Sequence, residues 1–141
     1  MSGFLLDTNV ISELVRPRPE PKVTSWIDAI GEEALYLSVL TLGEIRKGIA
    51  SLPASPRSNV LESWLNSDLP IRFASRILGI DAAIADRWGR LSAKTASVRK
   101  SLPVVDGLLA ATALHHNLVL VTRNTTDIEV TGVPFFNPWR R

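Results

Sequence analysis

The sequence predicts an α/β domain with a central parallel β-sheet and helices on both faces. Short apolar runs of strand type alternate with segments whose apolar residues recur every three or four positions, the spacing of a helix face. The strand-like runs are separated by these helical segments rather than by hairpin turns, which is typical of parallel sheets. Hydrophobic residues make up 45% of the chain, enough to bury a core.

The composition fits one domain spanning residues 1–141 and excludes several classes of site. Charged residues make up only 21%, which argues against a disordered chain. The absence of cysteine excludes disulfides, thiolate metal sites and cysteine nucleophiles. The net charge of +2 and the isoelectric point near 9.4 permit a polyanionic partner. No run is apolar enough for a membrane span or a signal peptide, so we expect a cytoplasmic protein without membrane contact.

The first strand is expected at residues 4–6, an apolar run that ends at Asp7. Residues 9–15 follow as one or two helical turns, and the proline-rich residues 16–21 end them because proline cannot continue a helix. At residues 22–30, apolar side chains at helical spacing predict an amphipathic helix.

The middle of the chain predicts a second strand at residues 35–39 and a helix at residues 41–51 with apolar side chains on one face. A further helix is expected at residues 57–68 and a weak strand at residues 76–80. Asp81 suits the N-cap of a long helix, because its carboxylate can accept hydrogen bonds from the first backbone N–H groups.

The last third contains the clearest strand, at residues 118–122, which is rich in β-branched residues. An alanine-rich helix is expected before it, at residues 104–116, and a short last strand after it, at residues 133–136. The polar residues that directly follow residue 122 predict a loop.

Four carboxylates are expected at or just beyond the carboxyl ends of strands, which line the ligand crevice of an open α/β sheet: Asp7, Glu44, Asp106 and Asp127. Each also has a structural explanation. Asp7 can cap the helix after it, and Glu44 completes a capping box that begins at Thr41. Asp106 is favoured by the dipole at a helix N-terminus, and Asp127 can form an Asx turn in a loop.

Taken together, the four acids are better explained as one site. Carboxylates within about 4 to 6 Å repel one another and would hold protons unless a cation neutralised them. Oxygen ligands suit Mg²⁺ or Mn²⁺, whereas the adjacent His115 and His116 point about 100° apart on a helix and cannot easily share a zinc ion. Thr122 and Asn124, just before Asp127, add oxygen ligands or hydrogen-bond donors.

An acidic cluster with Mg²⁺ is a familiar arrangement for phosphodiester cleavage. A nucleic-acid backbone that approaches such a negative pocket needs cations to guide it. Five basic residues lie near the acids in sequence, although each can equally be an ordinary surface charge. These candidates for RNA binding are Arg46, Lys47, Arg99, Lys100 and Arg123.

Four stretches, each containing one of the acids, resemble the PIN-domain ribonucleases, specifically the toxins of VapBC-type toxin–antitoxin pairs in their FitB-like branch. The stretches are residues 5–13, 42–49, 103–113 and 120–127. No single motif is decisive, but four in this order are specific, and with the end of the chain they cover nearly its whole length. Ile128 departs from the pattern, because many relatives carry phenylalanine there.

The resemblance implies a sheet of order 3-2-1-4-5 and a Mg²⁺-dependent endoribonuclease that cuts single-stranded or looped RNA with metal-activated water. In this family pattern, Asp7 and Asp106 are the surest metal ligands. Glu44 and Asp127 would ligate through water or orient the attacking hydroxide. The supporting residues would be Thr8, Asn9, Thr122 and Asn124.

The resemblance also implies a homodimer and a cognate VapB-type antitoxin whose C-terminal segment occupies the groove, with DNA contacted only through the antitoxin. The apolar surface of a dimer could come from the helix with Val23, Trp26 and Ile27 or from the helix with Trp64, but the same residues serve equally well as core.

Three other functions are compatible with an aspartate after the first strand or with a PIN-like fold. A haloacid dehalogenase-type phosphotransferase needs a second aspartate two residues after the first, where this chain has Asn9. A response-regulator receiver needs paired acids after the first strand and a phosphoacceptor aspartate after the third, and the sequence has neither. The remaining rival is non-enzymatic: a PIN-like binding module that acts mainly through its antitoxin complex in DNA-associated regulation.

Overall fold

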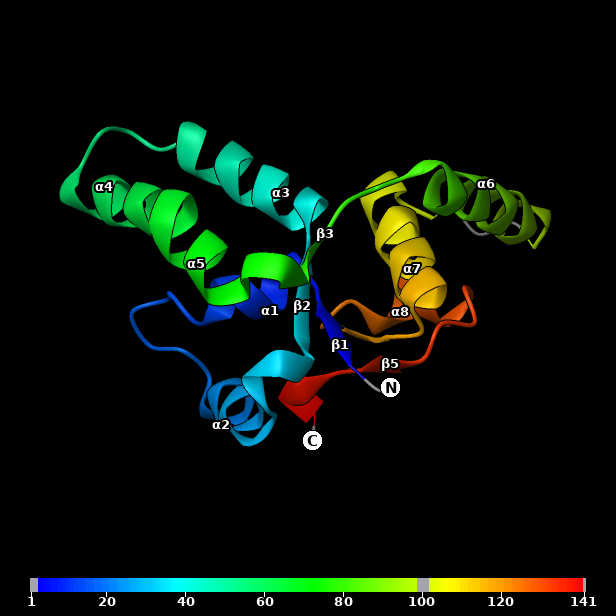
Figure 1. Cartoon of the computed structure of the whole chain (residues 1–141), viewed down its shortest axis with the longest axis horizontal. Helices are drawn as coiled ribbons and strands as arrows, with labels where there is room; N and C mark the ends of the chain where they lie inside the picture. Colours follow the sequence, from blue (N-terminus) through cyan, green and yellow to red (C-terminus); the bar gives the residue numbers. More distant parts are fainter. Residues whose placement is uncertain (1–2, 99–101, 141) are drawn as a thin grey trace.

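Within residues 3–98 and 102–140, the part of the chain that the computed structural model describes, five parallel strands form a sheet in the order β3-β2-β1-β4-β5 (Figure 1). The predicted fold class and the order 3-2-1-4-5 are confirmed. The strands are β1 (Phe4–Leu6), β2 (Leu35–Ser38), β3 (Ile77–Leu78), β4 (Val119–Val121) and β5 (Phe135–Phe136).

Helices cover both faces of this sheet, as predicted (Figure 1). One side carries α1 (Thr8–Glu13), α2 (Pro21–Ala29), α3 (Val39–Ala50), α4 (Pro56–Ser63), the π-helical turn η2 (Trp64–Asp68) and α5 (Leu69–Phe73). The other carries α6 (Ala82–Ser97), α7 (Val104–His116) and α8 (Thr125–Glu129). Short 3-10 turns lie at η1 (Glu32–Ala34), η3 (Ala74–Arg76) and η4 (Pro138–Arg140).

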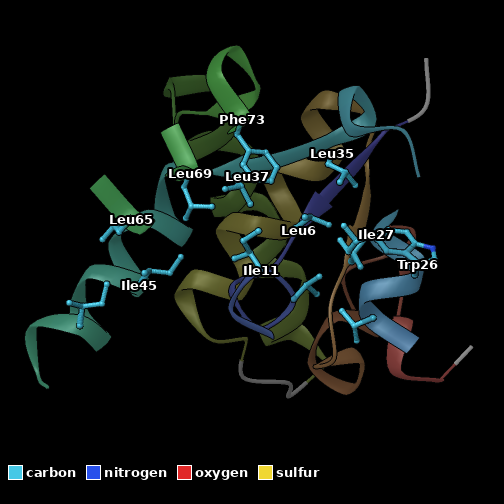
Figure 2. Packing of buried hydrophobic residues seen from close by; sticks show 14 residues of the cluster. Leu6, Ile11, Trp26, Ile27, Leu35, Leu37, Ile45, Leu65, Leu69 and Phe73 are labelled. Atoms are coloured by element: carbon cyan, nitrogen blue, oxygen red, sulfur yellow. The ribbon is translucent and has the colours of Figure 1, made fainter. Parts of the chain in front are cut away.

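Two hydrophobic cores lie on opposite faces of the sheet, because successive residues of a strand point to opposite sides. In β1, Leu6 enters the core formed with α1, α2, α3 and α5, and Leu5 enters the core formed with α6, α7 and α8. Val121 and Leu120 of β4 divide in the same way. Figure 2 shows the first core, where side chains from the helices pack around Leu6, Leu35 and Leu37.

The N-terminus of α3 corrects one prediction. The helix begins at Val39, two residues earlier than expected, because Ser38 is its N-cap and its hydroxyl accepts a hydrogen bond from the Leu40 N–H at 3.0 Å. Thr41 is therefore inside the helix and buried, and Glu44 lies in the second turn. The capping-box interpretation of Glu44 was wrong.

The segment that follows β4 differs from its predicted structure as well. Asp127 lies in the first turn of α8, not in a loop or an Asx turn. A helix of five residues is too short for periodicity to reveal it.

The helix expected at residues 57–68 is divided. The chain leaves α4 through η2, where the Leu69 N–H bonds to the Trp64 carbonyl, and continues as α5, which begins next to Pro70. Leu65 of η2 and Leu69 of α5 both enter the core.

One of the two helices considered for a dimer surface is core instead: Val23, Trp26 and Ile27 are all buried. In contrast, the predicted N-cap of α6 is confirmed, since the Asp81 carboxylate accepts the Ile84 N–H at 2.9 Å. Among the helices of the described residues, we find none with the length and apolarity that a membrane crossing requires.

Candidate functional site

The candidate site lies where the carboxyl ends of β1 and β4 meet. β1 is the central strand, and the chain leaves it toward β2 on one side and later returns through α7 to β4 on the other. This reversal of strand order is the switch point at which open α/β sheets bind ligands. The Asp7 N–H bonds to the Val121 carbonyl at 2.9 Å, which joins the two strand ends.

Asp7 is almost entirely buried at this point, with a 6% exposed fraction. Its Oδ1 accepts the Thr8 N–H at 2.7 Å, and its Oδ2 accepts the Thr122 hydroxyl at 2.8 Å. The bond to Thr8 makes Asp7 the N-cap of α1, so the capping role is also correct. Burial raises the pKa of Asp7, the hydrogen bonds from Thr122 and Thr8 act against this rise, and the charge of Glu44 adds to it.

Glu44 reaches the same place from α3. The Thr8 hydroxyl donates to Glu44 Oε1 and lies 3.2 Å from the hydroxyl of the buried Thr41. Thr8 therefore binds Asp7 through its backbone and Glu44 through its side chain, and it positions the two acids relative to each other.

Asp106 and Asp127 are joined by a single amide. Asn124 Nδ2 donates to Oδ2 of Asp106 and to Oδ2 of Asp127, at 3.1 Å each. The Asn124 backbone N–H donates to the Thr122 hydroxyl at 3.0 Å. Because that hydroxyl also donates to Asp7, one chain of hydrogen bonds connects the two halves of the site.

The charges of the four acids act on one another as well. The pKa of Asp106 is raised to about 6, first by burial and then by the negative charges of Asp7, Asp127 and Glu44, while the hydrogen bond from Asn124 lowers it. The structure thus brings all four predicted acids close enough together for their negative charges to act on one another.

The donor set of this pocket suits a hard divalent cation. In the part of the chain that the structure describes, no three His, Asp or Glu side chains are arranged to hold a metal ion directly. Mg²⁺ commonly binds proteins through one or two carboxylates and keeps several waters, so a complete protein cage is not required. A buried Asp7 beside an Asp106 that resists ionisation is a place where a cation would relieve repulsion.

The predicted RNA-binding cations have different surroundings. Arg46 pairs with Glu62 of α4, which favours a structural role between helices, and Lys47 is exposed. Arg99 and Lys100 lie outside the described residues. Arg123 follows Thr122 directly, and its guanidinium carbon lies 4.9 Å from the centre of the Trp139 ring.

Asn9 links this arginine to the site. Its Nδ2 lies 3.4 Å from Asp7 Oδ2, and its Oδ1 accepts the Arg123 backbone N–H at 3.4 Å. Both are long contacts, so Asn9 orients the strand ends more weakly than Thr8 or Thr122 does.

The sequence predicts no role for Glu13 or Trp139, and it predicts Thr41 only as the start of a capping box. Glu13 is buried and accepts the Glu20 N–H at 2.8 Å. Its position three residues after the apolar Val10 places a charge on the buried face of α1, and this signal could have been noticed. The contacts of Thr41 with Thr8 and of Trp139 with Arg123 join distant segments, which residue patterns do not reveal.

Comparison with known proteins identifies the fold and its group. The chain matches the PIN domain family model over residues 4–132. Toxin FitB of Neisseria gonorrhoeae is 39% identical over 136 residues, which cover 96% of this chain and 98% of FitB. VapC ribonuclease Y4jK of Sinorhizobium fredii is 38% identical over 136 residues, which cover 96% of this chain and 97% of that protein.

A solved structure agrees. A chain in FitAB bound to an IR36 DNA fragment has a TM-score of 0.91 and 38% identity, and the match covers 96% of this chain and 95% of that one. The chain therefore belongs to the PIN-domain family, in the group that includes toxin FitB and the VapC ribonucleases.

Proposed function

We propose that this protein is a metal-dependent endoribonuclease that acts as the toxin of a type II toxin–antitoxin pair and hydrolyses RNA phosphodiester bonds. The observation that carries the proposal is a hydrogen-bonded pocket of four carboxylates at the switch point of the sheet. The similarity to toxin FitB and to VapC ribonuclease Y4jK supports it.

Mg²⁺ or Mn²⁺ is the proposed cofactor. Asp7 and Asp106 would ligate it directly, and Glu44 and Asp127 would do so through water. Bound there, the ion would neutralise the acids, lower the pKa of a water molecule and stabilise negative charge on the leaving oxygen.

The chain's own residues would orient these groups. The hydrogen bonds from Thr8 and Thr122 favour the ionised form of the buried Asp7. The amide of Asn124 keeps Asp106 and Asp127 apart and aligned. Glu44 is half-buried and oriented by Thr8, so it is placed to accept a proton from an attacking water. Single-stranded or looped RNA is the proposed substrate, because its unpaired nucleotides can be splayed into a pocket.

The proposed partner is a cognate VapB-type antitoxin, and the proposed assembly of the toxin is a homodimer. The FitAB–DNA complex supports a second protein chain and an association of the pair with DNA. The four acids also give the partner a target, because a cationic side chain inserted among them would relieve their repulsion and exclude the metal.

The test is cleavage of a labelled single-stranded RNA by the purified, antitoxin-free protein. We expect cleavage with Mg²⁺ or Mn²⁺, none with EDTA, and loss of at least about 100-fold in rate for Asp7→Asn or Asp106→Asn. Asp28→Asn is the matched control, since Asp28 is an exposed carboxylate on α2, and it should cleave like the wild type.

Unchanged cleavage by Asp7→Asn and Asp106→Asn would show that the activity belongs to a contaminant or to another site. No metal-dependent cleavage by the wild type, together with tight binding of the antitoxin, would favour the non-enzymatic binding module instead.

A further inference from the structure

A polar cavity of about 480 Å³ is lined in part by Arg123, which follows Thr122 of the acidic site directly in the chain. It is bounded by the end of α1, by the proline-rich segment that follows and by η4. Its lining includes Glu13, Arg16, Arg18, Arg123 and Trp139. With Glu20 also in its lining, the cavity has three arginines against two glutamates.

Trp139 gives Arg123 a defined position. The guanidinium lies over the indole at 4.9 Å, a cation–π contact. The indole is partly buried against the core around α2, and the backbone N–H of Trp139 donates to Asn137 Oδ1 at 2.9 Å. A planar guanidinium seated on a fixed aromatic ring is pre-organised to donate hydrogen bonds to phosphate.

Glu13 connects two of the segments that line the cavity. Its carboxylate accepts the Glu20 N–H at 2.8 Å and pairs with Arg16 at 3.2 Å, which ties the proline-rich segment to α1. This pairing neutralises Glu13. Among the described residues, Arg18 and Arg123 form no ion pair with a carboxylate, so their charges are available to a bound anion.

Two segments of the chain, α1 and the residues after β4, carry residues of both the cavity and the acidic site. Arg123 follows Thr122 directly in the chain, and its backbone N–H contacts Asn9. The helix α1 lies between the two sites: its six residues run from Thr8, next to Asp7, to Glu13, a rise of about 9 Å. A polyanion whose backbone crosses the acidic pocket therefore passes close to the arginines.

We propose that this cavity, whose lining includes Arg18 and an Arg123 that stacks on Trp139, is a subsite that binds a backbone phosphate of the RNA strand next to the cleaved bond. The proposal rests on the proposed function and adds where the substrate is held. Attraction at the arginines would offset the repulsion that the four acids exert on the same strand.

The test combines steady-state cleavage of a single-stranded RNA with fluorescence anisotropy of the same RNA in EDTA. For Arg123→Ala we expect about a tenfold higher KM and Kd, a smaller change in kcat, and a salt dependence of log Kd that is shallower by about 0.7. Trp139→Leu should weaken binding in the same direction, and Arg123→Lys should recover part of it, because the charge returns without the planar fork.

Arg87→Ala is the matched control, since Arg87 is an exposed arginine on α6, and it should change KM and Kd less than about twofold. Unchanged KM, Kd and salt dependence in a folded Arg123→Ala would overturn the subsite. The same unchanged RNA values with weaker binding of the purified antitoxin would also overturn it and assign the cavity to a protein partner.

Failure of the proposed function is distinguishable from failure of the subsite. If the wild type does not cleave RNA, the anisotropy in EDTA still measures the contribution of Arg123 to RNA binding.

Discussion

Thr122 is the residue through which the two halves of the acidic pocket are joined. Its hydroxyl has one proton, which goes to Asp7, and its oxygen accepts the Asn124 N–H. The residue is fully buried, so no water can replace these bonds if the hydroxyl is removed.

Thr122→Val should therefore lower the free energy of unfolding by about 1–3 kcal/mol, because the buried Asp7 carboxylate loses its short hydrogen bond at Oδ2 and the Asn124 backbone N–H loses its acceptor. Cleavage should fall about 10- to 100-fold, the usual effect of losing a group that orients a metal ligand. Urea denaturation and RNA cleavage measure the two effects. Thr112→Val is the matched control: Thr112 is equally buried, but its hydroxyl bonds only to a carbonyl of its own helix. Equal losses in both variants would contradict the role of Thr122.

Asp106 makes the metal-free protein sensitive to pH. Its folded pKa of about 6 lies above the ordinary 3.8, so between these values the folded protein binds a proton that the unfolded chain has lost. The sign follows: the metal-free protein loses stability as pH rises from about 4 to about 6. Asp7, whose pKa is also raised, acts in the same direction.

Asp106→Asn should consequently stabilise the metal-free protein at pH 7.5, by about 1 kcal/mol once the partial exposure of this carboxyl is allowed for, and should have little effect at pH 4.5. Denaturation in EDTA at the two pH values checks this. A variant that is less stable than the wild type at pH 7.5 would show that the helix-dipole interaction of Asp106 outweighs the repulsion.

At the scale of elements, the packing of α6 against α7 positions Asp106. Gly107 allows this contact: a Cβ added there would lie 3.0 Å from Cδ1 and Nε1 of Trp88 and 3.2 Å from a methyl group of Leu102. The sequence shows only a glycine inside a helix, which costs stability relative to alanine. The reason for it lies in the neighbouring helix.

Gly89→Ala and Gly107→Ala should thus differ. At Gly89, in α6, nothing lies within 4 Å of an added Cβ, so alanine should stabilise the protein by about 0.5–1 kcal/mol. At Gly107 the displacement of Trp88 should cancel this gain or reverse it, and should shift the tryptophan emission. Equal stabilisation in both variants would mean that α6 can move away from α7 at little cost and does not position Asp106.

Element boundaries were predicted where the signal is local. The N-cap of α6 and the bounds of α7 follow from neighbouring residues and are confirmed. The start of α3 was misplaced because both Ser38 and Thr41 are plausible caps, and only the strand before Ser38 decides between them. The short α8 was missed because its stability comes from packing on α7 and β5 rather than from its own periodicity.

At the scale of the whole molecule, binding of a cation should couple to folding. The pocket is assembled from α1, α3, α7 and the β4–α8 connection, so a ligand that requires all of them stabilises only the folded chain.

Mn²⁺ in excess should raise the thermal midpoint, with a stabilisation of about 2.7 kcal/mol when its concentration is 100 times its Kd. The increase should be lost in Asp7→Asn, which removes a proposed ligand, and retained in Asp28→Asn. Differential scanning fluorimetry over a Mn²⁺ titration measures it. A midpoint that rises equally in Asp7→Asn would place the cation elsewhere.

The order of apolar runs along the chain was sufficient to predict the α/β class. The strand order was predicted from the family resemblance of the four motifs that contain the acids. Both depend on local residue patterns and on the order of motifs, which can be read from the sequence alone. The meeting of the acids is different, because Asp7 and Thr122 are far apart in the chain and become neighbours only when β1 and β4 pair.

Only the tertiary structure decides which polar side chains share a proton or a charge. Three features depend on contacts of a few ångströms between segments whose relative positions the sequence does not reveal. They are the Asn124 bridge between Asp106 and Asp127, the stacking of Arg123 on Trp139 and the burial of Glu13. Hydrogen bonds weaken steeply when their distance or angle departs from the ideal, and electrostatic interactions weaken with distance. Packing therefore decides which of them form, and the local amino-acid sequence does not.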